Sequence, residues 1–263
     1  MTLRATLATP EGKRRYVLRL FATIADRYDL ITVVLSYGRD RRWKRRLIEL
    51  AGMGPRDRVL DLACGTGDLL FAAAERAHTA VGVDITHRML ELAKNRGASR
   101  WHPTASDAAG APPGSSPGGP DGSAPHANAH LITADMLALP FGAARFDVVT
   151  TGYGLRNVPD LRAALAEIHR VLAPGGRLLS LDFNRPENPI VRAAYLTYLT
   201  LVGSMLGLLL HRNADTYRYI PESIRLYPGA AGVARLMEQV GLTDVRVVPV
   251  LGGLMAIHVG RKA

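Results

Sequence analysis

The segment VLDLACGTGDLL, residues 59–70, decides the fold class of this chain. It passes from a short apolar run into a turn that contains Gly65 and Gly67, and then into a second apolar run. Glycines in such a turn let the backbone approach a ligand closely, because they carry no side chain and accept positive φ angles. The segment therefore predicts a strand, a ligand-binding turn and a helix, in that order.

Three ligand classes use a glycine turn after a first strand, and two of them do not fit here. A P-loop requires Lys and then Ser or Thr after its last glycine, whereas Gly67 is followed by Asp68. A dinucleotide fingerprint requires a third glycine where this chain has Leu70. Asp68 would also repel a pyrophosphate at the positive N-terminus of the helix. The cofactor that fits is S-adenosylmethionine, which has an adenosine end, a cationic sulfonium and no phosphate.

Acidic residues follow the next two predicted strands. VGVDIT ends in Asp84, about 20 residues after the turn, where a carboxylate can accept both ribose hydroxyls. ADMLALPF places Asp135 after the third strand, where we expect it to meet the adenine amino group beside Met136. The structural alternatives are a helix cap at Asp68 and a strand-end turn at Asp84. The residues predicted to bind the cofactor are Asp61, Ala63, Gly65, Thr66, Gly67, Asp84, Ile85, Met89, Asp135, Met136 and Gly152.

Strand and helix patterns alternate along the chain. The last two strands are separated only by Leu-Gly-Gly and must be antiparallel, because a parallel pair needs a long crossover. The pattern predicts an α/β, Rossmann-like fold with a mostly parallel seven-stranded sheet, helices on both faces and an antiparallel terminal strand. The predicted strands are 58–62, 79–83, 130–133, 146–150, 177–183, 244–250 and 255–260, and the clearest predicted helices are 67–77, 86–95, 161–172 and 230–240.

Composition divides the chain further. Residues 1–57 are predicted to form an N-terminal helical cap on the main domain, 58–263. Residues 101–130 consist mostly of Pro, Gly, Ser and Ala, which predicts a disordered surface loop. A helical insertion is expected at about 185–228, and its apolar run, Tyr195–Leu210, is shorter than the ~20 residues that a membrane-spanning helix needs.

Charge and cysteine content limit the partners. The net charge of +10 suits an anionic partner, so an RNA-binding protein is a rival hypothesis, although the sequence contains no recognised RNA module. The basic and apolar segment 39–50 fits either a solvated helix face or contact with an anionic membrane. The single cysteine, Cys64, excludes an internal disulfide and is expected to pack, and the N-terminus lacks a secretory signal. We therefore expect a cytoplasmic protein, and the spacing of the histidines predicts no metal site.

Several motifs together resemble a known family. DLACGTGD, VDITHRMLELAK, ADMLALPF, GYGLRNVPD and RVLAPGGRLL resemble class I S-adenosylmethionine-dependent methyltransferases. GLRNVPD, with YDLITVVLSYGRDRRW upstream and YRYIPESIRLYPG downstream, resembles more narrowly the ubiquinone/menaquinone biosynthesis C-methyltransferase family. The resemblance covers about residues 16–262 without 101–130, and departs from the family pattern at Ile31-Thr32, Asp40, Gly152 and 182–184.

The resemblance implies methyl transfer from S-adenosylmethionine to a ring carbon of a polyprenylated quinol, as from demethylmenaquinol to menaquinol or in the equivalent ubiquinol-precursor step. Such a reaction needs a group that stabilises a phenolate, and Arg156 and Asn157 follow the fourth strand at the edge where ligands bind. Tyr28 and Asp29, from the family's first motif, are expected in the same pocket. The predicted catalytic residues are thus Arg156, Asn157 and Tyr28, with a structural salt bridge at Arg156 and packing at Tyr28 as the alternatives.

The resemblance also defines the expected partners. A lipophilic quinol is the expected substrate, and peripheral contact with the inner face of an anionic membrane and a homodimer are further expectations. No nucleic acid is expected. The alternatives left open are a methyltransferase for another lipophilic phenol and a non-catalytic S-adenosylmethionine-binding protein.

Overall fold

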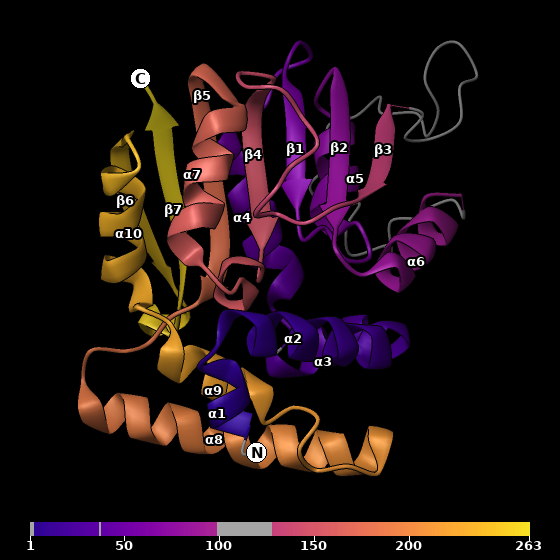
Figure 1. The fold of residues 1–263 in the computed structure, drawn as a ribbon, viewed down its shortest axis with the longest axis vertical. Coiled ribbons are helices and arrows are strands. Elements are labelled where there is room, and N and C mark those ends of the chain that lie inside the picture. The colour runs from indigo at the N-terminus through magenta and orange to yellow at the C-terminus, as the bar shows by residue number, and fades with distance from the viewer. Residues whose placement is uncertain (1–2, 37, 99–127) are drawn as a thin grey trace.

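The computed structural model describes residues 3–36, 38–98 and 128–263, so most of the predicted loop 101–130 lies outside the described residues. Within these ranges, seven strands form one sheet in the order β3-β2-β1-β4-β5-β7-β6 (Figure 1). β1 to β5 are parallel, whereas β7 is antiparallel to both β5 and β6. The predicted fold class is confirmed. The strands are β1 (Arg58–Leu62), β2 (Thr79–Asp84), β3 (Ala129–Thr133), β4 (Phe146–Gly152), β5 (Leu172–Phe183), β6 (Leu242–Val250) and β7 (Met255–Lys262).

β5 begins earlier than the sequence indicated. The predicted strand began at residue 177, after Pro-Gly-Gly, but β5 already pairs with β4 at Leu172 and continues through these residues. The register shifts between Phe146 and Val148 of β4, and regular pairing resumes at Arg177. The extra residues form a bulge, which Gly175 accommodates with a φ of +74°.

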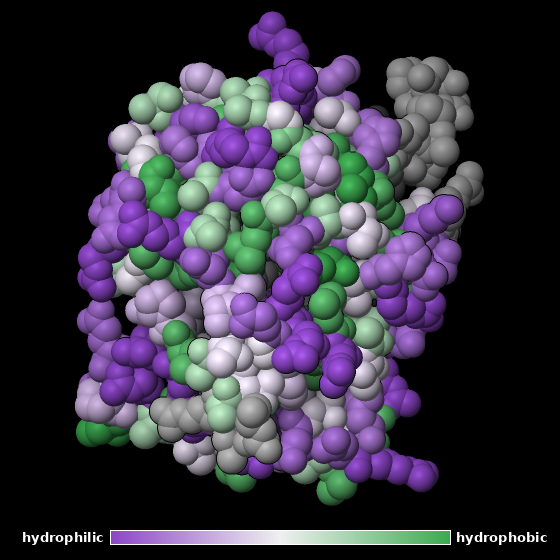
Figure 2. Space-filling model, in the orientation of Figure 1, coloured by the Kyte–Doolittle hydropathy of each residue, from purple (hydrophilic) through white to green (hydrophobic). Residues whose placement is uncertain are grey.

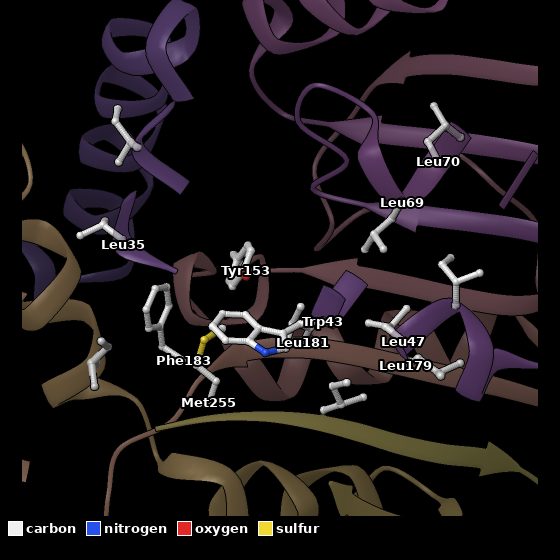
Figure 3. Packing of buried hydrophobic residues seen from close by; sticks show 14 of the residues in the cluster. Leu35, Trp43, Leu47, Leu69, Leu70, Tyr153, Leu179, Leu181, Phe183 and Met255 are labelled. Carbon is white, nitrogen blue, oxygen red and sulfur yellow. The ribbon is translucent and has the colours of Figure 1, made fainter. Parts of the chain in front are cut away.

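Helices cover both faces of the sheet (Figure 1). α4 (Asp40–Ala51) and α5 (Asp68–Ala74) pack on one face, and α7 (Leu161–Val171) and α10 (Gly229–Gln239) on the other. Figure 3 shows the first core, in which Trp43 and Leu47 of α4 lie against Leu179 and Leu181 of β5. Because strand side chains alternate between these two apolar layers, the parallel strands consist mostly of apolar residues. α6 (His87–Ala98) packs beside β3.

A second group of helices lies beyond the carboxyl ends of the parallel strands (Figure 1). α2 begins where the Thr9 side chain accepts a hydrogen bond from Gly12 N and Pro10 occupies the first turn. Asn188 caps the N-terminus of α8 in the same way, because its side chain accepts hydrogen bonds from Ile190 N and Val191 N. The group consists of α1 (Leu3–Leu7), α2 (Pro10–Ile24), α3 (Tyr28–Leu35), α8 (Pro189–His211) and α9 (Tyr219–Leu226).

α8 corrects one expectation. The sequence indicated an apolar run too short to cross a membrane, but the helix has 23 residues because its cap at Asn188 lies seven positions before Tyr195. Among the described helices it is the one long and apolar enough to cross a membrane by length and composition, and 33% of its most apolar window is buried inside the protein.

Candidate active site

A cavity of about 750 Å³, including its open mouth, lies where β1, β2, β3 and β4 end. This is within the size range of small-molecule sites, which are roughly 300–1,000 Å³. Helix α2 covers the side opposite the strand ends. The predicted cofactor residues that line this first cavity are Ala63, Gly65, Asp84, Ile85, Met89, Asp135, Met136 and Gly152.

The glycine turn after β1 has the geometry that its sequence predicts. Gly65 and Gly67 have φ angles of +54° and +91°, and a side chain at Gly67 would lie 2.4 Å from the Phe71 ring. At Gly65 the nearest atom to an added Cβ would be a Tyr28 ring carbon at 3.9 Å. The turn thus leaves open space over Gly65 on the side of the cavity, while Gly67 supports the helix behind it.

Asp84 is fixed at the end of β2 by two backbone donors. Its Oδ2 accepts a hydrogen bond from Gly65 N at 2.9 Å and its Oδ1 accepts one from Thr86 N at 2.8 Å. Burial raises the pKa of Asp84, although the hydrogen bonds from Thr86 and Gly65 oppose this rise. A carboxylate oxygen can accept more than one hydrogen bond, so both oxygens retain capacity for ligand hydroxyls.

An apolar slot in the cavity lies beside Asp84. Met89 and Met136 are 2% and 7% exposed, and both line the cavity. Asp135 closes the slot: its Oδ1 accepts from Leu137 N at 3.0 Å and its Oδ2 from Arg14 Nε at 3.0 Å. A ribose-binding carboxylate, a polarizable wall and a second carboxylate together fit an adenosine group.

Three predicted cofactor residues do not line this cavity. Thr66 Oγ1 donates to Asp29 Oδ1 at 2.8 Å and, like Gly67, supports the turn from behind. Asp61 is 1% exposed inside the sheet, where its Oδ1 accepts from Thr150 Oγ1 at 2.8 Å. Its Oδ2 has no hydrogen-bond partner among the described residues, and burial raises the pKa of Asp61 to about 7.

The raised pKa of Asp61 predicts a pH dependence of stability. Between about pH 4 and pH 7 the folded state holds a proton that the unfolded state has released, so the free energy of unfolding should fall by several kcal/mol as the pH rises. Asp61→Asn should flatten this slope, measured by urea unfolding at each pH. The control is Asp147→Asn, because Arg58 lowers the pKa of Asp147 and its contribution is lost only in stronger acid. An unchanged slope in Asp61→Asn would contradict this account.

Asp68, the acidic residue that follows the glycine turn, forms ion pairs with two basic side chains. Asp68 Oδ2 lies 2.7 Å from Lys44 Nζ, and its Oδ1 lies 2.7 Å from Arg96 Nη1. Burial alone would raise the pKa of Asp68, but these two cations outweigh it and lower the pKa. The repulsion of a pyrophosphate expected from the sequence is therefore largely neutralised, and the missing third glycine at Leu70 is the stronger argument against a dinucleotide.

A second cavity of about 510 Å³ adjoins the first. The two cavities share Phe21, Tyr28 and Tyr153, so these side chains form the wall between them. Aliphatic and aromatic side chains dominate the lining, and among the described residues Arg156 is its one charged member. The lining residues are Leu20, Phe21, Ile24, Tyr28, Ile31, Thr32, Leu35, Ser36, Tyr153, Arg156, Phe183, Thr216, Tyr217, Tyr219 and Ile220.

Arg156 is held rigidly in this apolar surrounding. It is 6% exposed, its Nε lies 3.1 Å from Asp182 Oδ1, and its guanidinium lies 5.0 Å from the centre of the Phe183 ring. Asp182 Oδ2 also accepts from Arg156 N at 3.1 Å. Burial raises the pKa of Asp182, and Arg156 opposes that rise. The salt bridge considered as the structural alternative exists, and it fixes a cation in the cavity wall.

Asn157 connects the two cavities. Its Oδ1 accepts from Arg156 Nη1 at 2.8 Å and from the Tyr219 hydroxyl at 2.9 Å, and its Nδ2 donates to Tyr153 O at 2.7 Å. Asn157 lines the first cavity while Arg156 lines the second.

Tyr28 lines both cavities. Burial raises the pKa of Tyr28, and the nearby Lys44 and Arg156 oppose this rise. The structure therefore brings the three predicted catalytic residues to one boundary.

Several residues of the site were missed by the sequence reasoning. Arg14, Val17, Leu18 and Phe21 of α2 line the first cavity, and their i, i+3, i+4, i+7 spacing was the signal that could have found them. Tyr153, in the same motif as Arg156, has a φ of +61° and donates to Asp40 Oδ1 at 2.6 Å. Its place between the cavities had no separate signal in the sequence.

Cys64 has no chemical role in this arrangement. It is buried beneath the turn, where its Sγ would lie 2.9 Å from a side chain added at Gly82. Burial and the neighbouring Asp61 and Asp84 raise the pKa of the thiol well above its ordinary value, which is unfavourable for a nucleophile. In the described ranges no group of three or more His, Cys, Asp or Glu residues could hold a metal.

Comparison with known proteins decides which reaction this geometry serves. The sequence profile of the ubiE/COQ5 methyltransferase family matches residues 9–102 and 122–262, and a general methyltransferase domain matches residues 60–180. The chain belongs to the ubiE/COQ5 methyltransferase family. It is an S-adenosylmethionine-dependent C-methyltransferase, as the resemblance implied, and the predictions of enzyme class and cofactor are confirmed.

Two curated relatives show how completely this family covers the chain. The ubiquinone/menaquinone biosynthesis C-methyltransferase of Teredinibacter turnerae is 38% identical over 254 residues, which cover 95% of this chain and 93% of the relative. The demethylmenaquinone methyltransferase of Thermus thermophilus is 38% identical over 245 residues, which cover 92% and 100%. The family match therefore extends over the helices around the second cavity.

Solved structures support the fold. An S-adenosylmethionine-dependent methyltransferase from Thermotoga maritima aligns with a TM-score of 0.61 at 15% identity, covering 94% of this chain and all of that one. The N-methyltransferase NodS from Bradyrhizobium japonicum, in complex with S-adenosyl-L-homocysteine, gives a TM-score of 0.53 at 16% identity, covering 85% and 87%. At these identities the likeness concerns the fold.

Proposed function

We propose that this family member methylates a ring carbon of a polyprenylated quinol, converting demethylmenaquinol to menaquinol or acting at the equivalent ubiquinol-precursor step. The observation that carries the proposal is the second cavity, an apolar space with one fixed cation that shares a wall with the cofactor cavity. The names of the curated relatives specify this acceptor class, which supports the choice.

The roles of the predicted cofactor residues follow from their positions. Asp84 would accept hydrogen bonds from the ribose, Asp135 would face the adenine amino group, and Met89 and Met136 would cover the ring. S-Adenosylmethionine supplies an electrophilic methyl group when bound in this cavity. The protein's task is to hold the acceptor ring beside it at the shared wall, since orientation alone accounts for much of the rate of such reactions.

Arg156 would act on the acceptor hydroxyl. A quinol ring carbon becomes nucleophilic when the hydroxyl next to it loses its proton, and a cation in an apolar cavity stabilises the resulting phenolate strongly. Arginine stays protonated, so it is not the base itself, and the hydroxyl proton would pass to water. As the carbon–methyl bond forms, the sulfonium–methyl bond would break to leave S-adenosylhomocysteine, and the ring proton at that carbon would then also pass to water. Asn157 would orient the guanidinium, and Tyr28 would contact the ring from the shared wall.

The arrangement of helices supports a division of the chain into a cap and a methyltransferase domain. We propose that residues 1–57 form a cap over both cavities, together with the helical insertion at about 185–228, while the remaining chain forms the methyltransferase domain. A lipophilic acceptor and the net positive charge of the protein favour methylation at the cytoplasmic face of a membrane. A homodimer stays a prediction.

The redox state of the acceptor tests this function. A demethylated naphthoquinone with a short tail should be methylated in the presence of dithionite and not without it, because the oxidised ring is electron-poor and has no hydroxyl to ionise. Product is measured by mass spectrometry. Equal turnover of the oxidised form would contradict the phenolate mechanism, and turnover of simple lipophilic phenols in place of the quinol would favour the alternative acceptor class.

A further inference from the structure

We propose that the outward face of α3 and α8 is the surface by which this protein docks on an anionic lipid membrane, next to the second cavity. This lipid face consists of Leu30, Val33, Val34, Ile190, Val191, Leu201, Met205, Leu208 and Leu209. The inference rests on the proposed function in one respect, namely that the acceptor is a membrane lipid. It specifies the surface and the partner that deliver this acceptor.

α8 exposes large apolar side chains at its start and along its second half, with the small Ala193, Ala194 and Thr197 exposed between them. Ile190, Leu201, Leu208 and Leu209 are 79%, 66%, 59% and 70% exposed. No acidic or basic side chain interrupts the helix between Arg192 and His211. At the lower edge of the molecule, where Figure 1 places α8, Figure 2 shows separate hydrophobic residues among hydrophilic ones. An exposed apolar surface of this kind marks an interaction site.

α3 connects this surface to the acceptor site. One side of the helix, with Tyr28, Ile31 and Leu35, lines the second cavity. The other side exposes Leu30 and Val33, which are 53% and 42% accessible. α3 is apolar on both of these sides, and its one acidic residue, Asp29 in the first turn, lies 3.3 Å from Arg96 Nη1. Exposed apolar side chains on a helix that also lines an apolar cavity suit contact with lipid. It is the thin wall between the cavity and the lipid face.

α8 is built to lie along a membrane surface rather than to cross it. Its inner side is packed on the protein through Tyr195, Leu199 and two glycines. A side chain at Gly207 would meet Asn213 O at 2.4 Å, and one at Gly203 would meet Tyr217 Cβ at 3.2 Å. Such close packing ties one side of the helix to the domain, while the other side is free to enter the interface between headgroups and acyl chains.

The basic residues at the end of α8 favour anionic lipid over a second copy of this chain. Arg192 near the start of the helix is offset by the exposed Glu187, whereas Arg212 and Arg27 lie at its end, where the Arg27 guanidinium donates to Leu210 O. The nearby Asp215 is paired with Arg218 at 2.8 Å. Two copies joined through this face would bring basic residues together, whereas anionic headgroups would be attracted to them.

A vesicle flotation assay with a charge-matched control tests the inference. Leu201→Glu with Leu208→Glu changes the net charge from +10 to +8, and so does Arg42→Gln with Arg45→Gln. Arg42 and Arg45 are exposed on α4, which covers a face of the sheet away from α8 (Figure 1). The vesicles contain phosphatidylcholine with or without phosphatidylglycerol, and the unaltered protein should float with the anionic ones.

The lipid-face variant should bind anionic vesicles at least about tenfold more weakly, because it loses the burial of two leucines. The α4 variant should stay within about threefold of the unaltered protein, because the attraction of a basic residue to anionic lipid falls off within a Debye length of about 10 Å and α4 lies away from the lipid face. Turnover of a short-tailed quinol in solution should be unchanged in the lipid-face variant, and turnover of a long-tailed quinol in vesicles should fall.

Two outcomes would overturn the lipid face. Equal vesicle binding by the lipid-face variant and the unaltered protein would show that another surface docks. An unaltered protein that ignores vesicles but changes from dimer to monomer on Leu201→Glu with Leu208→Glu, measured by size-exclusion chromatography with light scattering, would show a dimer interface instead. Failure of the proposed acceptor is read separately, as absent turnover of the short-tailed quinol with vesicle binding intact.

Discussion

Asp84→Ala is expected to weaken the binding of S-adenosylmethionine by at least about 100-fold, because two hydrogen bonds to a charged carboxylate are lost, each contributing roughly 1.5–3 kcal/mol. The substitution also removes the acceptor for Gly65 N and Thr86 N, which Asp84 holds at 2.9 Å and 2.8 Å. The glycine turn is then less well fixed for the cofactor. Isothermal titration calorimetry with S-adenosylmethionine measures the affinity directly.

Two further variants separate contact with the ligand from support of the turn. Asp84→Asn keeps one acceptor oxygen and nearly the same shape, so its affinity should lie between those of the parent and Asp84→Ala. Asp135→Asn alters the other acidic residue in the same cavity, where Arg14 already occupies one oxygen, and it should cost less. Unchanged affinity in Asp84→Ala would remove Asp84 from the cofactor site.

Arg156→Gln should lower kcat by about 10²–10³, the usual cost of losing one donor that stabilises developing negative charge. The affinity for S-adenosylmethionine should change little, because Arg156 lines the second cavity and not the first. Arg156→Lys should restore only part of the turnover, since an ammonium group cannot reproduce the planar fork. Single-turnover kinetics with a reduced short-tailed quinol separate the chemical step from binding.

Arg156→Gln also breaks the buried ion pair between Arg156 and Asp182, so its effect on stability can be separated from its effect on turnover. Removing Arg156 leaves Asp182, which is 1% exposed, without its cation, and loss of one partner of a buried pair typically costs about 3–5 kcal/mol of stability. Arg156→Gln combined with Asp182→Asn removes both charges, so the melting temperature should recover while kcat stays low. If the double variant recovers both, Arg156 is only a structural residue and Tyr28 becomes the next candidate.

Local sequence patterns determined the sheet and the cofactor side of this site. The run 59–70 contains its own strand, its turn glycines and its helix, and these depend on neighbours a few residues away. The short Leu251–Gly253 connection leaves an antiparallel pair as the only arrangement for β6 and β7. Because parallel strands end at one edge, residues that follow them, such as Asp84 and Asp135, had to meet there.

The tertiary structure alone decided the acceptor side. Tyr28 and Arg156 come together because α3 and the segment after β4 line the same cavity, and no spacing in the sequence encodes a contact over that separation. Sequence spacing could not pair Arg156 with Asp182 either, so it left a free cation and a salt bridge as open alternatives. The orientation of α8 was also decided by the tertiary structure, although its apolar residues were evident in the sequence. Which of them face the protein depends on the close approach of Gly203 to Tyr217 and of Gly207 to Asn213. Burial is a property of the assembled helices, and the periodicity of one helix does not say what covers each of its sides.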